Sequence, residues 1–290
     1  MTSPYSQPVD LRLSVESSLE MVASSAYCNN LELGYLIDDD APDAILCDAH
    51  TLQSVVTALL YFCVSNLDSG FVQVLVRSLL LYGNRYQLRF SVNGVRQDVP
   101  ISEKSKSGSG PGKQSNTLDE LLTFCSQQMS LLSGRMTVEE GLENGYRFHL
   151  NLQAESVPVS LPAYRESFQP LLQYRQVLVL SPHIINRDLL LQQSKRWGLI
   201  TRTFQEAKEI PGDLLEPGAF DLAILDSFWA CSPSSDSSSG IYLPGDLPVI
   251  LCDCPGGQYP IGFQGDQIKA QLAKPIVPSR LYDALTHLLG

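Results

Sequence analysis

The sequence is poor in positive charge for its length. It contains 20 lysine and arginine residues against 31 aspartate and glutamate residues among 290, which gives a net charge of −11. An acidic chain repels the phosphate backbone of nucleic acids, and neither half of the sequence contains a basic block that would offset this repulsion. We therefore expect no nucleic-acid partner.

Long apolar runs are also absent. No stretch approaches the roughly 18 consecutive apolar residues of a membrane helix, and Met1–Tyr5 lacks the basic start and the apolar run of a signal peptide. The seven cysteines, an odd number, lie mostly in apolar segments, which is typical of reduced core thiols. These features predict a cytoplasmic protein without a membrane segment.

The residues that are present suit a globular α/β protein of two domains. The chain is 44% hydrophobic, and its length matches two domains at about 100–200 residues each. A proline-bearing stretch predicts a linker at 155–172. The helices and strands before it predict an α/β sandwich at 1–154, whereas the strand–helix alternation after it predicts a doubly wound parallel sheet at 173–290.

The spacing of the apolar residues gives the expected elements. We expect helices at 11–26, 49–67, 118–132, 187–197 and 278–289. We expect strands at 31–37, 44–47, 71–81, 86–95, 135–139, 146–152, 176–180, 220–225, 247–252 and 271–273. A segment rich in serine, glycine and lysine predicts a loop at 102–116. Ligands of a doubly wound sheet bind at the carboxyl ends of its strands, which selects Ser181, Pro182, His183, Asp226, Asp253 and Lys274.

Four features of the second half occur in a characteristic order. These are a strand at 177–180, a strand that ends at Asp226, a strand at 247–251, and Lys274-Pro275 before the last helix. Together they resemble the receiver domain of two-component signalling over nearly all of 173–290. The resemblance implies a flavodoxin-like fold with Asp226 at the phosphoacceptor position and Lys274 at the position of its partner lysine. It also implies a Mg²⁺ site built from an acidic pair and the acceptor aspartate.

The acidic pair is missing from this receiver-like half. Ser181-Pro182 stand at its position with His183 beside them, and Asp253 stands where the resemblance implies a hydroxyl residue that binds the phosphoryl group. Phosphoryl transfer requires that the transferred negative charge be neutralised, so a carboxylate at 253 opposes it. Two interpretations of Asp226 and Lys274 remain: a phosphoacceptor with its lysine, or a salt bridge that fixes one conformation.

The first half also contains motifs in a characteristic order. Val9–Leu11 opens a helix, Cys47–Ala49 opens a second one, and Leu131–Val138 precedes the strand at 146–150. Over residues 9–152 these motifs resemble the ATP-binding catalytic domain of a hybrid histidine kinase, of the GHKL type. The resemblance implies a nucleotide pocket with a Mg²⁺-binding Asn on the long helix, an Asp that holds adenine, and a glycine-rich segment at the phosphates.

The residues of that pocket differ from the pattern that the resemblance implies. Ala58 and Phe62 stand at the Asn positions, and Val92 stands at the Asp position before Gly94. The second glycine-rich segment reads Thr117–Leu121 and carries two acidic residues that would repel a triphosphate. None of the four histidines has the sequence context of a phosphoaccepting histidine. We therefore expect a degenerate, pseudokinase-like chain with no enzymatic activity, no cofactor and no bound metal.

The motifs of both folds are present, but the residues that would bind Mg²⁺ and phosphate are not. This combination predicts a binding protein. We expect a non-catalytic regulator or adaptor that binds a sensor histidine kinase, a receiver or a phosphotransfer protein and modulates phosphate flow, with a homodimer as a further arrangement. Candidate contact residues are Phe124, Met129, Trp229 and Tyr282, and core packing is the alternative for the two helices that carry Phe124, Met129 and Tyr282. Two alternatives remain: an atypical phosphoacceptor at Asp226, and a small-molecule sensor that uses the former ATP pocket.

Overall fold

The computed structural model describes residues 6–96, 112–139, 145–227, 243–253 and 267–290, and for 112–117 it describes the backbone alone. The chain divides into two compact units, Met1–Val159 and Ser160–Gly290. No helix in these described ranges is both long enough and apolar enough to cross a membrane.

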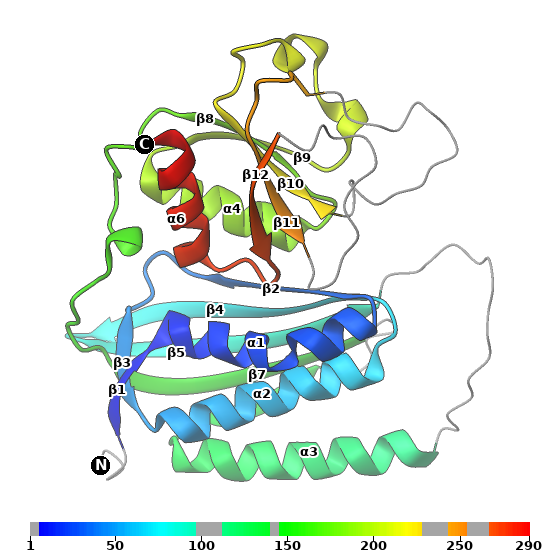
Figure 1. Cartoon of the computed structure of the whole chain (residues 1–290). Coiled ribbons are helices and arrows are strands. Elements are labelled where there is room, and N and C mark those ends of the chain that lie inside the picture. The colour runs from blue at the N-terminus through cyan, green and yellow to red at the C-terminus, as the bar shows by residue number, and fades with distance from the viewer. Residues whose placement is uncertain (1–5, 97–111, 140–144, 228–242, 254–266) are drawn as a thin grey trace. The chain divides into compact units, whose positions relative to one another are not determined.

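The first unit is a two-layer α/β structure, as the sequence predicts (Figure 1). Its main sheet has the strand order β2-β4-β5-β7-β6, and β1 pairs with β3 in a separate two-stranded sheet. On one side of the main sheet, α1 packs against α2, and α2 packs against α3. The elements are β1 (Gln7–Asp10), α1 (Leu11–Cys28), β2 (Leu31–Ile37), β3 (Ala44–Cys47), α2 (Ala49–Asn66), β4 (Gly70–Tyr82), β5 (Arg85–Arg96), α3 (Gly112–Leu131), β6 (Arg135–Glu139) and β7 (Gly145–Glu155).

An aspartate begins each of the first two helices. The side chain of Asp10 accepts a hydrogen bond from the Leu13 N–H at 2.9 Å, and that of Asp48 accepts one from the Thr51 N–H at 3.1 Å. Each carboxylate satisfies a backbone donor that has no partner inside its helix, which is the usual role of an N-cap residue. These caps explain why α1 and α2 begin where the sequence pattern places them.

The main sheet has one face toward the helices and one away from them. Leu88, Phe90 and Val92 of β5 are fully buried, and a Cβ on Gly94 would lie 3.1 Å from Cys63 Sγ of α2. Even-numbered residues of β5 therefore face the helices. Because side chains alternate along a strand, Arg89 and its odd-numbered neighbours project to the opposite face, which we call the outer face.

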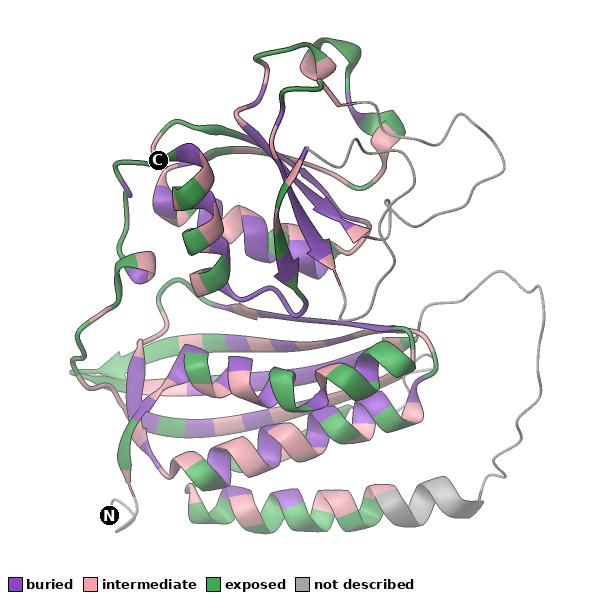
Figure 2. Ribbon diagram, viewed as in Figure 1, coloured by how far each residue is buried: buried purple, intermediate pink, exposed green. Residues whose placement is uncertain are grey.

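The second unit contains the predicted parallel sheet, with the strand order β12-β11-β10-β8-β9. This is the flavodoxin-like order, in which all strands are parallel and the order of successive strands across the sheet reverses between β8 and β10. The central strands are almost wholly buried (Figure 2). The elements are η1 (Ala163–Arg165), β8 (Gln176–Leu180), α4 (Ile184–Trp197), β9 (Ile200–Phe204), η2 (Ala207–Glu209), η3 (Gly212–Leu215), β10 (Leu222–Asp226), β11 (Val249–Asp253), β12 (Ile268–Ala273) and α6 (Pro278–Leu289).

Three features of the fold differ from the sequence expectations. Strands β1 and β9 were not predicted, and the segment after β9 forms two 3₁₀ turns that bring Ile210 into the core of the second unit. The backbone is helical from Gly112 onward, so α3 begins within the predicted loop 102–116, of which 102–111 lie outside the described residues. The later part of the predicted linker packs within the second unit, since Trp197 Nε1 donates to the Tyr164 carbonyl at 2.7 Å and the Tyr282 hydroxyl donates to Gln169 Oε1 at 2.9 Å.

Candidate functional site

The carboxyl ends of the parallel strands bring three predicted site residues together. Asp226 ends β10, Ser181 follows β8, and Lys274 follows β12. The reversal of strand order between β8 and β10 opens a crevice at this edge in folds of this type, and chemistry is found there. All three residues are buried, with 2%, 3% and 8% of their surfaces exposed, respectively. The sequence-based choice of this edge thus selects residues that lie in one cluster.

Lysine and serine hold the Asp226 carboxylate from two sides. Lys274 Nζ lies 2.8 Å from both Oδ1 and Oδ2 of Asp226, and Ser181 Oγ donates to Oδ2 at 2.9 Å. A buried ion pair offsets its desolvation cost only where the geometry is good and further hydrogen bonds are made. The two contacts from Lys274 and the third from Ser181 meet that requirement.

Ser181 stands where the resemblance implies one of the acidic residues, and its hydroxyl both donates and accepts. It donates to Asp226 and accepts the backbone N–H of His183 at 3.3 Å. The Arg187 guanidinium, on the second turn of α4, donates to the Ser181 carbonyl. Sequence reasoning did not select Arg187 as a site residue, although its place near the start of a helix after the first strand of the unit was visible.

The remaining residues of the predicted receiver-like site lie around this cluster. His183 is the N-cap residue of α4 and caps the helix without a side-chain hydrogen bond. Asp253 ends β11, and its carbonyl accepts the Lys274 N–H at 2.9 Å. A Mg²⁺ ion prefers several carboxylate oxygens and near-octahedral geometry. Ser181 and Pro182 supply no carboxylate at the position of the implied acidic pair, and an ammonium group lies against both oxygens of Asp226, so these residues lack the donor set that the resemblance implies for Mg²⁺.

Apolar and aromatic residues occupy the predicted ATP-binding region of the first unit. Ala58 and Phe62 lie half-buried on α2, and Val92 is fully buried on β5. The Phe62 ring packs edge-on against Tyr146, with centroids 5.0 Å apart, and against Phe148 at 5.9 Å. None of these side chains carries an amide or a carboxylate, so they do not fit the metal and adenine contacts that the resemblance implies.

Tyr146 is a member of this cluster that the sequence reasoning did not select. Its ring is stacked on Phe148 at 6.3 Å, and burial is the main cause that raises the pKa of its hydroxyl. It lies opposite Gly94 in the β5–β7 ladder. A cross-strand partner of Gly94 would have been found once β5 and β7 were aligned, because the alternation of the two strands fixes their register.

Each unit contains a pocket. A pocket of about 220 Å³ in the first unit is lined by residues that include Cys47, Asp48, Arg85 and Glu155. A second pocket, of about 120 Å³, lies in the other unit beside Phe220. Neither lining includes the predicted pocket residues Ala58, Phe62, Val92 and Gly94.

The predicted partner-contact residues differ in their exposure. Met129 was expected on a surface but is only 1% exposed, because it shares the inward face of α3 with the buried Cys125, one turn earlier. Phe124 is 40% exposed. Tyr282 is partly buried, with its ring 5.5 Å from that of Trp197, and Trp229 lies outside the described residues.

Comparison with known proteins finds similarity to signal transduction histidine kinases over part of the chain. No family model matches. The signal transduction histidine-protein kinase BarA of Escherichia coli K12 is 25% identical over 99 residues, which is 34% of this chain and 11% of that kinase, and BarA of Shigella flexneri matches equally. The crystal structure of full-length ShkA in complex with AMPPNP has a TM-score of 0.69 at 17% identity, and the match covers 98% of this chain and 57% of that one.

These matches agree with the two observed folds. The chain spans only a small part of the curated kinases that it matches, and the ShkA similarity supports the fold of both units. The fold class predicted from the sequence, an ATPase-like sandwich followed by a receiver-like parallel sheet, is confirmed. The chain is thus similar in sequence to a two-component histidine kinase over about a third of its length, and both of its units share their fold with the matched part of ShkA.

Proposed function

We propose that the chain is a non-catalytic regulator of a two-component phosphorelay. It binds a sensor histidine kinase, a receiver or a phosphotransfer protein and alters the flow of phosphate through that partner. The observation that carries this proposal is the cluster at the receiver-like edge, where Lys274 and Ser181 bind the Asp226 carboxylate and Ser181-Pro182 stand at the position of the acidic pair that the resemblance implies.

The first unit supports the same proposal. A kinase domain must hold Mg²⁺ and the triphosphate with polar side chains and backbone amides. Phe62, Tyr146 and Phe148 form an aromatic cluster at the corresponding place. Such a cluster stabilises the domain as a scaffold and offers nothing to neutralise phosphate charge.

Phosphate transfer measured with purified proteins tests this function. The chain alone, incubated with Mg²⁺ and ATP labelled at the γ-phosphate, is expected to incorporate no label. Added to a purified hybrid histidine kinase from the same organism, it is expected to change the kinase's steady-state phosphorylation severalfold in a dose-dependent way, whereas heat-unfolded chain has no effect. Labelling of the chain by ATP alone would overturn the proposal, as would unchanged phosphorylation in every sensor kinase of that organism.

A second candidate function rests on Asp226 itself. Its carboxylate ends β10 at the point where receivers accept phosphate, and Lys274 is beside it. Acetyl phosphate would transfer its phosphoryl group to a carboxylate oxygen, which gives an acyl phosphate and releases acetate. Intact-mass measurement with acetyl phosphate and Mg²⁺ would then show one added phosphoryl group that is lost in Asp226→Asn. An unchanged mass rejects this alternative.

A further inference from the structure

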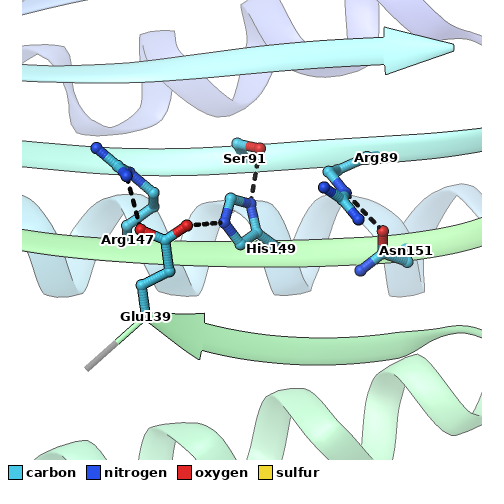
Figure 3. A network of polar contacts seen from close by, with 6 residues as sticks. All are labelled: Arg89, Ser91, Glu139, Arg147, His149 and Asn151. Carbon is cyan, nitrogen blue, oxygen red and sulfur yellow. Dashed lines mark hydrogen bonds and ion pairs between the residues drawn. The ribbon is translucent and has the colours of Figure 1, made fainter.

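The main sheet of the first unit places polar side chains in a line across its outer face. The strand registers pair Arg77 of β4 with Arg89 of β5, Arg89 with Asn151 of β7, and Asn151 with Arg135 of β6. Residues paired across neighbouring strands project to the same face, so all four stand on the outer face, where Figure 3 shows Arg89 and Asn151. We call Arg77, Arg89 and Arg135 the arginine row.

The arginine row is exposed, and no acidic side chain in the described part of the chain is paired with it. All three side chains belong to exposed residues, and Arg89 donates from Nε to Asn151 Oδ1 at 2.9 Å. Among the residues that the structure describes, no carboxylate forms an ion pair with any of the three. The row therefore places three uncompensated positive charges on a chain whose net charge is −11.

In a neighbouring group of residues on the same face, an acidic side chain offsets the positive charge. Glu139 accepts from Arg147 Nη1 at 2.6 Å and lies 2.9 Å from His149 Nε2, and His149 Nδ1 lies 2.8 Å from Ser91 Oγ (Figure 3). In the arginine row, by contrast, Arg77 and Arg89 are directly opposite each other, and like charges in that position destabilise a sheet. Within the described residues the row has the hydrogen bond from Arg89 to the neutral Asn151, and no carboxylate is paired with it to offset the repulsion.

We propose that the arginine row binds an extended acidic segment of a protein partner, with carboxylates at alternate positions of that segment. The row crosses three strand spacings, about 14 Å, and three alternate side chains of an extended chain span about 13 Å. Guanidinium groups match carboxylates in shape and charge. Leu79, which is 63% exposed, lies two residues along β4 on the same face and provides an apolar contact beside the row.

Charge favours a protein segment over a nucleic acid as the occupant. A polyanion would meet the repulsion of the whole acidic chain, and this repulsion grows with the length of the polyanion. A short acidic segment of a protein meets mainly the local field of the row, since charges beyond about 10 Å are screened at ordinary ionic strength. The inference rests on the proposed function, to which it adds a docking surface and the chemistry of the partner.

Peptide binding to the full chain tests the inference. The probe is a fluorescent peptide with the sequence Gly-Glu-Ser-Glu-Leu-Glu-Gly, and its control has Gln in place of each Glu. We expect the acidic peptide to bind and the Gln control peptide not to bind. The affinity of the acidic peptide is expected to fall as salt is added. The triple variant Arg77→Gln, Arg89→Gln, Arg135→Gln is expected to weaken it about tenfold or more. The matched variant Lys195→Gln, Arg202→Gln, Lys269→Gln removes the same charge from exposed residues of the second unit and is expected to bind like the parent.

The stability of the triple variant separates lost binding from lost folding. Because the substitutions remove like-charge repulsion across the sheet, the row variant is expected to melt at the same temperature as the parent or higher. Equal loss of binding in both triple variants, no binding of the acidic peptide, or tighter binding of a short oligothymidylate would each overturn the inference. If the row variant binds the acidic peptide as tightly as the parent chain, and the chain still alters kinase phosphorylation, then the proposed function stands and only the docking surface is wrong.

Discussion

At the scale of single residues, Lys274 and Asp226 are each costly to bury alone, and each is buried against the other. Their side chains are 6% and 1% exposed, respectively, and the ammonium lies 2.8 Å from the carboxylate. Removing one member of a buried pair leaves the other charge without compensation. The pair is therefore the residue-scale feature that most constrains the receiver-like site, whatever its role in signalling.

Lys274→Met tests that constraint. The substitution keeps an unbranched side chain but removes the ammonium, so we expect a loss of about 3–5 kcal/mol in the free energy of unfolding. Both tryptophans of the chain, Trp197 and Trp229, lie in the second unit, so urea titration followed by tryptophan fluorescence reports on that unit. Lys208→Met, which breaks the exposed pair with Glu206, is the control and should leave the midpoint unchanged. Equal midpoints for the two variants would contradict this prediction.

Burial also determines which thiols react. Desolvation raises the pKa of Cys47, Cys63 and Cys125 to about 12 in each case. A raised thiol pKa lowers the thiolate fraction at any pH below it, and the thiolate is the reactive form. At pH 8 in native buffer, iodoacetamide is expected to label the exposed Cys28 and to leave these three unlabelled, as read by peptide mass mapping.

The control for thiol labelling is the unfolded chain. In urea all of these cysteines are expected to react, because the burial that suppresses their ionisation is gone. Labelling of Cys63 in native buffer as fast as Cys28 would show that α2 opens readily, and it would refute the prediction. The same pKa shift predicts that stability falls as the pH rises from about 9 toward 12, because the thiols then ionise in the unfolded chain and not in the folded one.

At the scale of helices and strands, the sequence predicted those elements whose bounds depend on residues close to them in the chain. The bounds of β2 and β3 agree with the sequence because apolar alternation and flanking turn residues define them. Strand β9 was missed because three of the five residues of Ile200–Phe204 are threonine or arginine. As an edge strand it is only partly buried, so it lacks the apolar run that marks a central strand. Met129 was chosen as a contact residue together with Phe124, which lies on the same helix. Residues five apart on a helix do not share a face, and Met129 faces inward whereas Phe124 is 40% exposed.

In the candidate site, too, some contacts were predictable from the sequence and others depend on the packing of distant segments. That Asp226 and Lys274 meet was predictable because the carboxyl ends of parallel strands converge. The edge-on contact of Phe62 with Tyr146 was not predictable from either segment, since it depends on the packing of α2 against a strand far along the chain. The arginine row likewise requires the registers of four strands, which no local pattern contains.

The cap of α2 gives a prediction at the element scale. Asp48→Ala removes the acceptor for the Thr51 N–H and is expected to cost about 1 kcal/mol of unfolding free energy. Asp48→Asn keeps a good capping side chain and should retain most of the parent stability. Thermal melts followed by far-ultraviolet circular dichroism compare the two. A melt for Asp48→Ala that coincides with the parent would show that α2 does not depend on this cap.

At the scale of the whole molecule, each unit has its own sheet and its own core. In the second unit the buried residues Leu178, Leu225 and Leu251 come from three central strands of the sheet, and residues 163–173 pack onto the same unit. A domain with a complete sheet and a contiguous core is expected to fold without the rest of its chain. The fragment 160–290 contains all of these elements.

We therefore expect the fragment 160–290 to be a monomer with a cooperative urea transition. Lys274→Met should lower the unfolding free energy of the fragment by the same amount as in the full chain, because Lys274, Asp226 and Ser181, which together form the cluster, all belong to the fragment. The matching fragment 1–159 has no tryptophan and is followed by circular dichroism. If fragment 160–290 shows no cooperative transition, or if Lys274→Met acts only in the full chain, then the receiver-like fold requires the first unit for its stability and the two units form one folding domain.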